Sequence, residues 1–294
     1  MSLEAVVRQI ESRGDLPTIG AVAARVVRLA ADPDMDFRAV GRIIEQDPAL
    51  AARVLRVANS PYYGVPGRVG TVERAVALLG FSQIRNIALS LSLISDLSRW
   101  GDGEEAFRWD RFWEHSVGCA YFSEALARQA GLPASGGEYA GGLLHDVGKI
   151  LLGHHFPREF QEALRLAARE RQGLLEAERR VFGTDHAEVG GWLAAKWSFP
   201  PDLLASIRHH HAPDAAGEYT TVARIVHVAD LFTKAKCIGF GGDVVAVCLA
   251  EDPAWQRLVR DHPGLGGLDV ERFTLRLDQE VELARDLART AERQ

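Results

Sequence analysis

Apolar positions follow a helical spacing through most of the first hundred residues. Val22, Val26 and Leu29 recur at intervals of three and four, which places them on one face of a helix. Pro48 follows a second stretch of this kind and suits the first turn of the next helix, where no amide partner is needed. The strict alternation typical of strands is missing, so the pattern predicts an all-α chain with one long apolar helix over residues 82–97.

Polar and glycine-containing stretches indicate how these helices are grouped. Residues 99–106 read RWGDGEEA, which predicts a linker after an N-terminal helical subdomain at 1–105. A second helical subdomain is then expected at 106–235, followed by C-terminal helices at 236–294. The apolar run at 244–250 is short enough for a strand, although its neighbours have helical patterns.

Composition narrows the class of protein. The chain has 294 residues, 47% of them hydrophobic, and a formal net charge of -6. Nucleic acids and membrane surfaces are therefore disfavoured as partners, because no basic excess exists to neutralise phosphates. The sequence has no membrane-spanning apolar run and no signal-peptide pattern. Its 3 cysteines are scattered, which does not suggest a disulfide framework. We expect a cytoplasmic protein.

Histidine is unevenly distributed, because all 10 histidines lie after residue 114. His115 falls on the apolar face that Phe112, Cys119 and Phe122 form in a predicted helix, so its imidazole is expected to point inward. This residue is either a metal ligand or a core histidine that bonds one carbonyl group, since buried polar groups usually find a partner.

The adjacent residues His145 and Asp146 lie in the apolar segment AGGLLHDVGKILL, which predicts a helix. Neighbouring helix residues differ in direction by about 100°, but both can reach a metal ion that lies between their faces. Gly141, Gly142 and Gly148 would let another group approach this helix closely. Burying the pair without a partner is costly, so a metal ion is favoured over a local ion pair.

Three further segments supply imidazole or carboxylate groups. His186 lies in the capping-box pattern TDHAE, where it is either an inward ligand or an ordinary helix-start residue. His210 and His211 continue the inward face of the helix before them, while His209 is expected to point elsewhere. Asp230 lies among apolar residues of another predicted helix and therefore needs a partner.

Imidazole nitrogens and carboxylate oxygens together favour iron, manganese, zinc or nickel over calcium. Asp146 has two oxygens and can bridge two metal ions. Two ions about 3.5–4 Å apart would activate a water molecule and stabilise the oxygens of a phosphoryl displacement. Lys149 lies one turn after His145, where its ammonium group could meet a substrate phosphate or could simply be a solvated surface lysine. The candidate catalytic groups are therefore Asp146 and Lys149.

These residues lie in motifs that resemble the HD superfamily of metal-dependent phosphohydrolases. The resemblance rests on LLHDVGKILL, on the upstream histidine in FWEHSVG and on the downstream aspartate in VHVADLF. The stretches LPTIGAVAARVVRLAADPD, IIEQDPALAARVLRVANSPYYG and TVERAVALLGFSQIRNIALS are more specifically similar to the HDOD family, and the likeness covers roughly residues 14–212. It implies an N-terminal helical bundle packed on an HD-type helical core, which residues 236–294 complete, and a role in bacterial signal transduction.

The related HD-GYP cyclic di-GMP phosphodiesterases imply a set of metal ligands for this chain, residue by residue. The set consists of His115, His145, Asp146, His186, His210, His211 and Asp230. The Gly-Tyr-Pro signature is missing after His211, and Arg111 stands one turn before His115, where trinuclear members carry a glutamate. The resemblance therefore implies one or two divalent ions and argues against cyclic di-GMP as the substrate.

Two functions fit the sequence. The first is a regulatory output protein of the HDOD family that binds signalling proteins and carries a di-metal site. The second is a metal-dependent phosphohydrolase with a cyclic or linear nucleotide as its ligand, and here catalysis stays open, because ligand positions do not prove a substrate pocket. A nucleic-acid-binding regulator is opposed by the acidic balance. We adopt the first function as the biological role and expect metal to bind.

Overall fold

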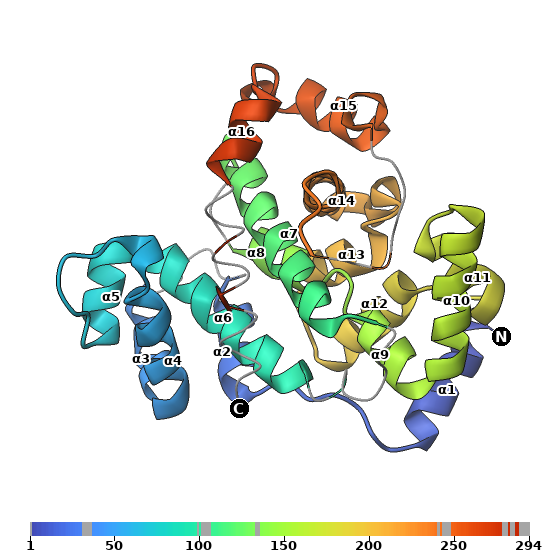
Figure 1. Ribbon diagram of the computed structural model, residues 1–294, viewed down its shortest axis with the longest axis horizontal. Coiled ribbons are helices and arrows are strands. Elements are labelled where there is room, and N and C mark those ends of the chain that lie inside the picture. Colours follow the sequence, from blue (N-terminus) through green and yellow to red (C-terminus); the bar gives the residue numbers. More distant parts are fainter. Residues whose placement is uncertain are drawn as a thin grey trace.

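The computed structural model describes residues 2–30, 37–98, 100, 107–132, 136–239, 242, 248–277, 282, 286 and 287. Every regular element in this part of the chain is a helix, which confirms the all-α prediction (Figure 1). The α-helices are α1 (Leu3–Ser12), α2 (Ala21–Ala30), α3 (Phe37–Glu45), α4 (Pro48–Ala58), α5 (Val72–Leu79), α6 (Phe81–Ser98), α7 (Trp109–Gln129), α8 (Gly137–Leu144), α9 (Gly148–His155), α10 (Pro157–Glu170), α11 (Leu174–Phe182), α12 (His186–Lys196), α13 (Pro201–His209), α14 (Thr220–Ala235), α15 (Pro253–Asp261) and α16 (Val270–Arg276). Short 3-10 helices are η1 (Pro61–Tyr63), η2 (Pro213–Tyr219), η3 (Leu249–Glu251) and η4 (Pro263–Leu265).

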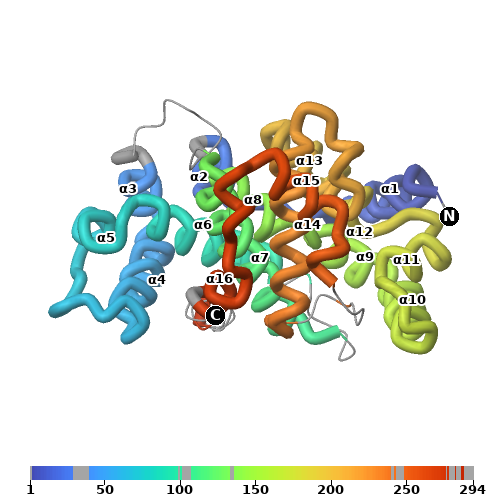
Figure 2. The backbone as a smooth tube through the Cα atoms, turned by 90° about the horizontal axis from the view of Figure 1, so that it is seen from above, coloured from blue at the N-terminus to red at the C-terminus, as the bar shows by residue number. Residues whose placement is uncertain are grey.

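Helices α3, α4 and α5 form a lobe at one end of the molecule, and α6 joins this lobe to the rest (Figures 1 and 2). α4 begins at Pro48 as predicted, and the side chain of Asp47 caps it by accepting two hydrogen bonds of 3.0 Å from first-turn amides. α6 packs against α2, α4 and α5, and all of its residues at 84–94 are buried. The long apolar helix predicted at 82–97 is therefore the centre of the N-terminal bundle, because it is buried on all sides along residues 84–94.

Helix α1 packs away from this lobe, against α12 near the opposite end of the molecule (Figure 2). The Nζ atom of Lys196 lies 2.7 Å from a carboxylate oxygen of Glu11. The indole nitrogen of Trp197 donates a hydrogen bond of 2.9 Å to the carbonyl oxygen of Pro17. The first helix is thus attached to the part of the molecule that contains α7 to α14, and the division into three parts at 105 and 235 stays a prediction.

The centre of the molecule is built around α7, which packs against α8 and α14. α12 packs against both α9 and α13. Buried apolar side chains from α1 through α13 form one continuous cluster, so the N-terminal bundle and the helices that follow it share a hydrophobic core. This packing brings three helix ends toward α7 and α14. They are the C-terminal ends of α8 and α13 and the N-terminal end of α12.

Two sequence predictions fall largely outside the described residues. Of the linker at 99–106 the structure describes only Trp100, and of the apolar run at 244–250 only the last three residues. Among the helices that the structure describes, none is both long and apolar enough to cross a membrane.

Candidate metal centre

Seven side chains from separate parts of the fold converge at the centre of the molecule. They lie on α7, in the turn after α8, at the start of α12, in the turn after α13, and on α14. They are His115, His145, Asp146, His186, His210, His211 and Asp230. All of them are buried except His211, which is half-buried. The structure therefore brings together every metal ligand expected from the sequence. His209 lies outside the cluster, in keeping with the expectation that it points elsewhere.

His145 and Asp146 do not lie inside a helix, and the sequence prediction was wrong on this point. α8 ends at Leu144 and α9 starts at Gly148. Between them the backbone forms hydrogen bonds over three residues, as from the amide of Val147 to the carbonyl of Leu144 at 3.0 Å. Such bonds wind the backbone more tightly than an α-helix does. The turn that results carries both side chains into the same site.

The glycines around this turn allow close packing between helices. A Cβ atom on Gly142 would lie 2.7 Å from the Cα atom of Ala120 in α7. A Cβ atom on Gly148 would lie 2.0 Å from the carbonyl oxygen of His186 in α12. The close approach predicted for these glycines is therefore made by neighbouring helices, which places His186 beside Asp146.

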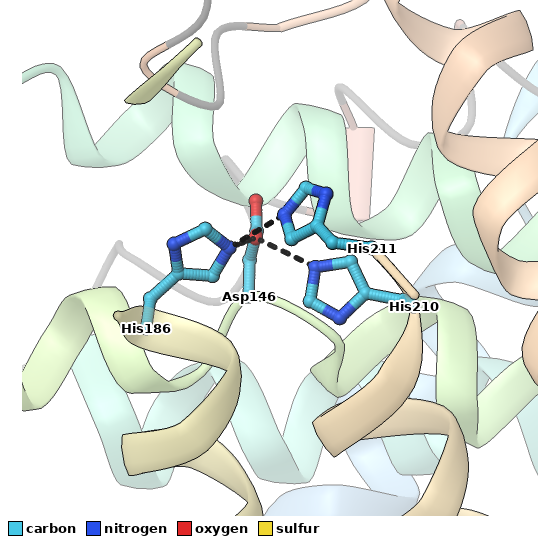
Figure 3. A group of neighbouring side chains, drawn as sticks. All are labelled: Asp146, His186, His210 and His211. Atoms are coloured by element: carbon cyan, nitrogen blue, oxygen red, sulfur yellow. Dashed lines mark hydrogen bonds and ion pairs between the residues drawn. The ribbon is translucent and has the colours of Figure 1, made fainter. Parts of the chain in front are cut away.

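Asp146 lies between two groups of histidines and faces each group with a different oxygen. Its Oδ1 atom lies 3.2 Å from Nε2 of His186 and 3.7 Å from Nε2 of His210 (Figure 3). Its Oδ2 atom lies 3.3 Å from Nε2 of His145 and 3.8 Å from Nε2 of His115. A carboxylate in this position can bridge two ions, one in each group.

We name these two groups site 1 and site 2. Site 1 consists of His115, His145 and Asp146 with Asp230 beside them, and site 2 consists of Asp146, His186, His210 and His211. In site 1, Oδ1 of Asp230 lies 3.1 Å from Nε2 of His115. In site 2, Nε2 of His186 lies 2.9 Å from Nε2 of His211. Apart from Asp230, the ligand atoms in each site lie within 4.8 Å of one another, close enough to share one ion.

Four buried atoms of the two sites make no hydrogen bond of good geometry among the described residues, although two of them, Nε2 of His115 and Oδ1 of Asp230, lie 3.1 Å apart. They are Nε2 of His115, His145 and His210 and Oδ1 of Asp230. Leaving a buried polar atom unpaired costs on the order of 1–3 kcal/mol. Divalent cations would pair all four atoms, because imidazole nitrogen and carboxylate oxygen are both ligands of transition metals. The residues present therefore fit a metal centre.

The opposite ring nitrogens of three histidines are held by hydrogen bonds. Nδ1 of His145 and Nδ1 of His210 each donate to the carbonyl oxygen three residues earlier, at 2.7 and 2.8 Å. Nδ1 of His186 donates to Oε2 of Glu178 at 2.5 Å. Bonds of this kind fix the orientation of each ring and leave Nε2 available for a metal ion.

Glu178 was not among the residues singled out from the sequence. Its side chain is fully buried in α11, and it also accepts a hydrogen bond of 2.9 Å from the backbone amide of His186. The sequence does indicate that Glu178 is buried, because it shares one helix face with Leu174, Ala177 and Phe182. An acidic residue on an apolar face needs a buried partner, and His186 is that partner.

Each carboxylate of the centre is paired with a lysine. Nζ of Lys149 lies 2.6 Å from Oδ2 of Asp146, and its side chain is 1% exposed, which excludes a solvated surface lysine. Nζ of Lys234 lies 2.7 Å from Oδ2 of Asp230. Lys234 was also missed, although it follows Asp230 by one turn of α14. Two ammonium groups therefore lie against the two sites.

Burial and neighbouring charges set the protonation of these groups. Burial would raise the pKa of Asp146, but the adjacent His145 holds it well below the usual range. Burial lowers the pKa of His210, and the positive charges of His145 and His186 lower it further. Burial opposes the protonation of His186 as well, but Glu178 raises the pKa of this imidazole to about 9. Asp146 is thus anionic and His210 neutral, as metal binding requires, whereas the cationic His186 must release a proton when an ion binds.

Arg111 lies in the first turn of α7, one turn before His115. Its Nε atom is 3.4 Å from Oε2 of Glu114, and its Nη2 atom donates to the carbonyl oxygen of Gly239 at 3.2 Å. Neither group of candidate ligands includes Arg111 or Glu114. The candidate ligands found among the described residues therefore form two groups, site 1 and site 2.

Comparison with known proteins places this chain in a family. The model of the HDOD domain family matches residues 16–213. The crystal structure of an HDOD domain protein of unknown function from Geobacter sulfurreducens is similar, with a TM-score of 0.80 and 27% sequence identity over 100% of both chains. The residues that the family model matches include helices α2 to α6 and the turn that carries His145 and Asp146.

Two curated proteins are similar over part of their length. An uncharacterized protein of Treponema pallidum is 25% identical over 219 residues, which are 74% of this chain and 42% of the relative. Ribonuclease Y of Thermus thermophilus is 28% identical over 152 residues, which are 52% of this chain and 21% of that protein. This chain thus spans less than half of either relative.

Proposed function

Because the chain belongs to the HDOD family, we propose that it is a bacterial signal-transduction output protein whose HD-type core binds two divalent transition-metal ions. One observation carries the proposal: Asp146 turns one oxygen to each of two histidine groups. The unpaired ring nitrogens in both sites support it. Iron, manganese, zinc and nickel all suit this donor set. The partners would be signalling proteins.

Metal content tests this proposal. We expect the wild-type protein, reconstituted with manganese, iron or zinc, to hold about two ions per chain. Asp146→Ala removes the ligand that the two sites share. It leaves three ligand residues in each site, so both ions should be held more weakly and the metal content should fall. His209→Ala is the matched control, since His209 is an adjacent histidine outside both sites. Elemental analysis measures the number of metal ions per chain in the three proteins. A wild-type protein that takes up no metal from any of these solutions would refute the proposal.

Hydrolysis of a phosphoester in a cyclic or linear nucleotide is the second candidate function. Lys149 and Lys234 favour it, because two ammonium groups beside the sites could hold the oxygens of a phosphate. When bound, metal ions at such a centre supply Lewis acidity toward phosphoryl oxygens. The likeness to a ribonuclease over half of this chain points to the same class of bond.

A panel of cyclic and linear nucleotides, offered to the metal-loaded protein, distinguishes the two functions. Turnover that disappears in Lys149→Met at unchanged metal content would support a phosphohydrolase. If the protein holds its full complement of metal ions and turns over no member of the panel, the signalling role is the only one of the two functions that remains.

A further inference from the structure

His227 on α14 connects the turn that carries two metal ligands to the C-terminal helix α15. Its Nδ1 atom donates a hydrogen bond of 2.6 Å to the carbonyl oxygen of His210. Its Nε2 atom donates a hydrogen bond of 3.0 Å to Oδ2 of Asp252. A carbonyl and a carboxylate can only accept, so both ring nitrogens carry a hydrogen. The His227 side chain is half-buried, with 16% exposed, and it bonds the backbone of the turn that carries two residues of site 2.

The carbonyl group of His210 needs such a donor. α13 ends at His209, so the carbonyl groups that follow lack the amide partners of a continuing helix. Pro213, three residues after His210, has no amide hydrogen to offer. His227 supplies the missing donor from another helix. The hydrogen bond therefore fixes the turn from which His210 and His211 enter site 2.

Asp252 is held at the other end of this connection. It is the N-cap residue of α15, and its Oδ1 atom accepts a hydrogen bond of 2.8 Å from the amide of Trp255. Its second oxygen accepts the bond from His227. One carboxylate thus fixes both the start of α15 and the imidazole behind site 2. α15 lies beyond the residues 16–213 that the family model matches.

We propose that His227 is a positioning residue of site 2 that makes metal binding and the packing of α15 depend on each other. This inference rests on the proposed metal centre and adds a route by which the C-terminal helices influence it. Coupling between two equilibria is reciprocal. A metal ion that fixes the His210 turn therefore stabilises α15, and loss of the His227 contacts weakens metal binding at site 2.

Two substitutions separate the two halves of this connection. Asparagine places its amide near Nδ1 of the imidazole it replaces, so His227→Asn keeps a donor for His210 and loses Asp252. Glutamine reaches the position of Nε2, so His227→Gln keeps the contact with Asp252 and loses the bond to His210. Asp261→Asn is the matched control, because it removes a different contact between α14 and α15, the 3.2 Å ion pair of Arg224 with Asp261.

Calorimetric titration of the full chain with Mn²⁺ or Zn²⁺ gives the first readout. We expect His227→Gln to bind about tenfold more weakly at site 2, as is usual when a residue behind a metal ligand is lost. His227→Asn should stay within about threefold of wild type, because the donor for His210 is kept. Melting of the metal-free proteins serves as the check on structure, since both variants remove the same imidazole and should lose similar stability.

Amide hydrogen exchange over residues 253–261 gives the second readout. The metal ion should slow exchange in the wild-type protein and in Asp261→Asn, but in neither His227 variant. Equal metal affinity of the wild-type protein and both variants would overturn the inference and leave the metal centre in place. Equal weakening in His227→Asn and His227→Gln would also overturn it, because that is the pattern of lost packing alone. A wild-type protein that binds neither ion would overturn both the inference and the proposed function.

Discussion

At the residue scale, the partner of a buried imidazole decides its charge in this protein. His155 is buried at the end of α9, and neither of its ring nitrogens has a hydrogen-bond partner among the described residues. Burial, together with the nearby positive charges of His154 and Arg13, lowers the pKa of His155 to about 4. His186 is equally buried, but its bond to Glu178 raises its pKa to about 9. A carboxylate beside the ring therefore reverses the effect of burial.

The low pKa of His155 predicts a loss of stability in acid. Between its folded pKa of about 4 and its ordinary value of 6.5, the unfolded chain binds more protons at this residue than the folded one. The free energy of unfolding therefore falls as the pH falls through that window. We expect His155→Phe to lose less stability than wild type between about pH 7.5 and pH 5, by on the order of 1 kcal/mol. Urea unfolding at the two pH values measures this difference, and an equal loss in both proteins would contradict it.

At the scale of elements, glycine lets the helices around the metal centre approach one another. α8 packs closely against α7, and α9 packs against α12. Gly142 and Gly148 lie at these contacts, where a Cβ atom would meet the backbone of the facing helix. The separation of these helices sets the distances between Asp146 and the histidines. The packing of small residues therefore determines the geometry of the ligands.

Substitution of Gly148 tests this role. Gly148→Ala places a methyl group against the carbonyl oxygen of His186, so α9 and α12 must move apart. We expect a loss of about 3 kcal/mol in the free energy of unfolding and weaker metal binding, because a packed interior cannot absorb the extra group. Gly41→Ala in α3 is the control, since no atom lies within 4 Å of its Cβ position. It should stabilise the protein by about 0.5–1 kcal/mol, and a similar loss in both variants would contradict the argument.

At the scale of the whole molecule, the two helical halves share one hydrophobic core. The same cluster of buried side chains contains Leu50 of α4 and Ile207 of α13. α6 lies between the lobe of α3 to α5 and the HD-type core (Figure 1). A change in the packing of the lobe can therefore reach the helices that carry the ligands.

This shared core predicts that both halves unfold together. Five of the 6 tryptophans lie after residue 105, and Trp100 packs against His154 of α9, so their fluorescence reports chiefly on the part of the chain after residue 105. Leu50→Ala leaves a cavity in the lobe and should cost about 2–5 kcal/mol. We expect it to shift the fluorescence transition as far as the far-ultraviolet circular dichroism transition. Leu78→Ala is the control, because Leu78 is 46% exposed and its loss should move neither curve. A fluorescence transition unchanged by Leu50→Ala would show that the halves unfold separately.

Some features of this protein follow from the sequence because they are local. Helical spacing of apolar residues and proline and glycine positions are properties of neighbouring residues, so the start of α4 and the long helix α6 could be predicted. The seven candidate ligands could be named because each lies on an inward face or in a recognisable motif. The helix expected around His145 was wrong, because bonds over three residues form a turn there that the apolar pattern does not distinguish from a continuous helix.

Other features depend on distances between residues far apart in the chain, and only the tertiary structure decided them. The division of the Asp146 oxygens between two sites follows from how α7, α12 and α13 pack around one turn. The contacts of Glu178 and His227 behind the ligands depend on that packing too, because each joins separate helices. The sequence therefore determined which groups are available to bind metal, and the packing of the helices determined which of them face one another.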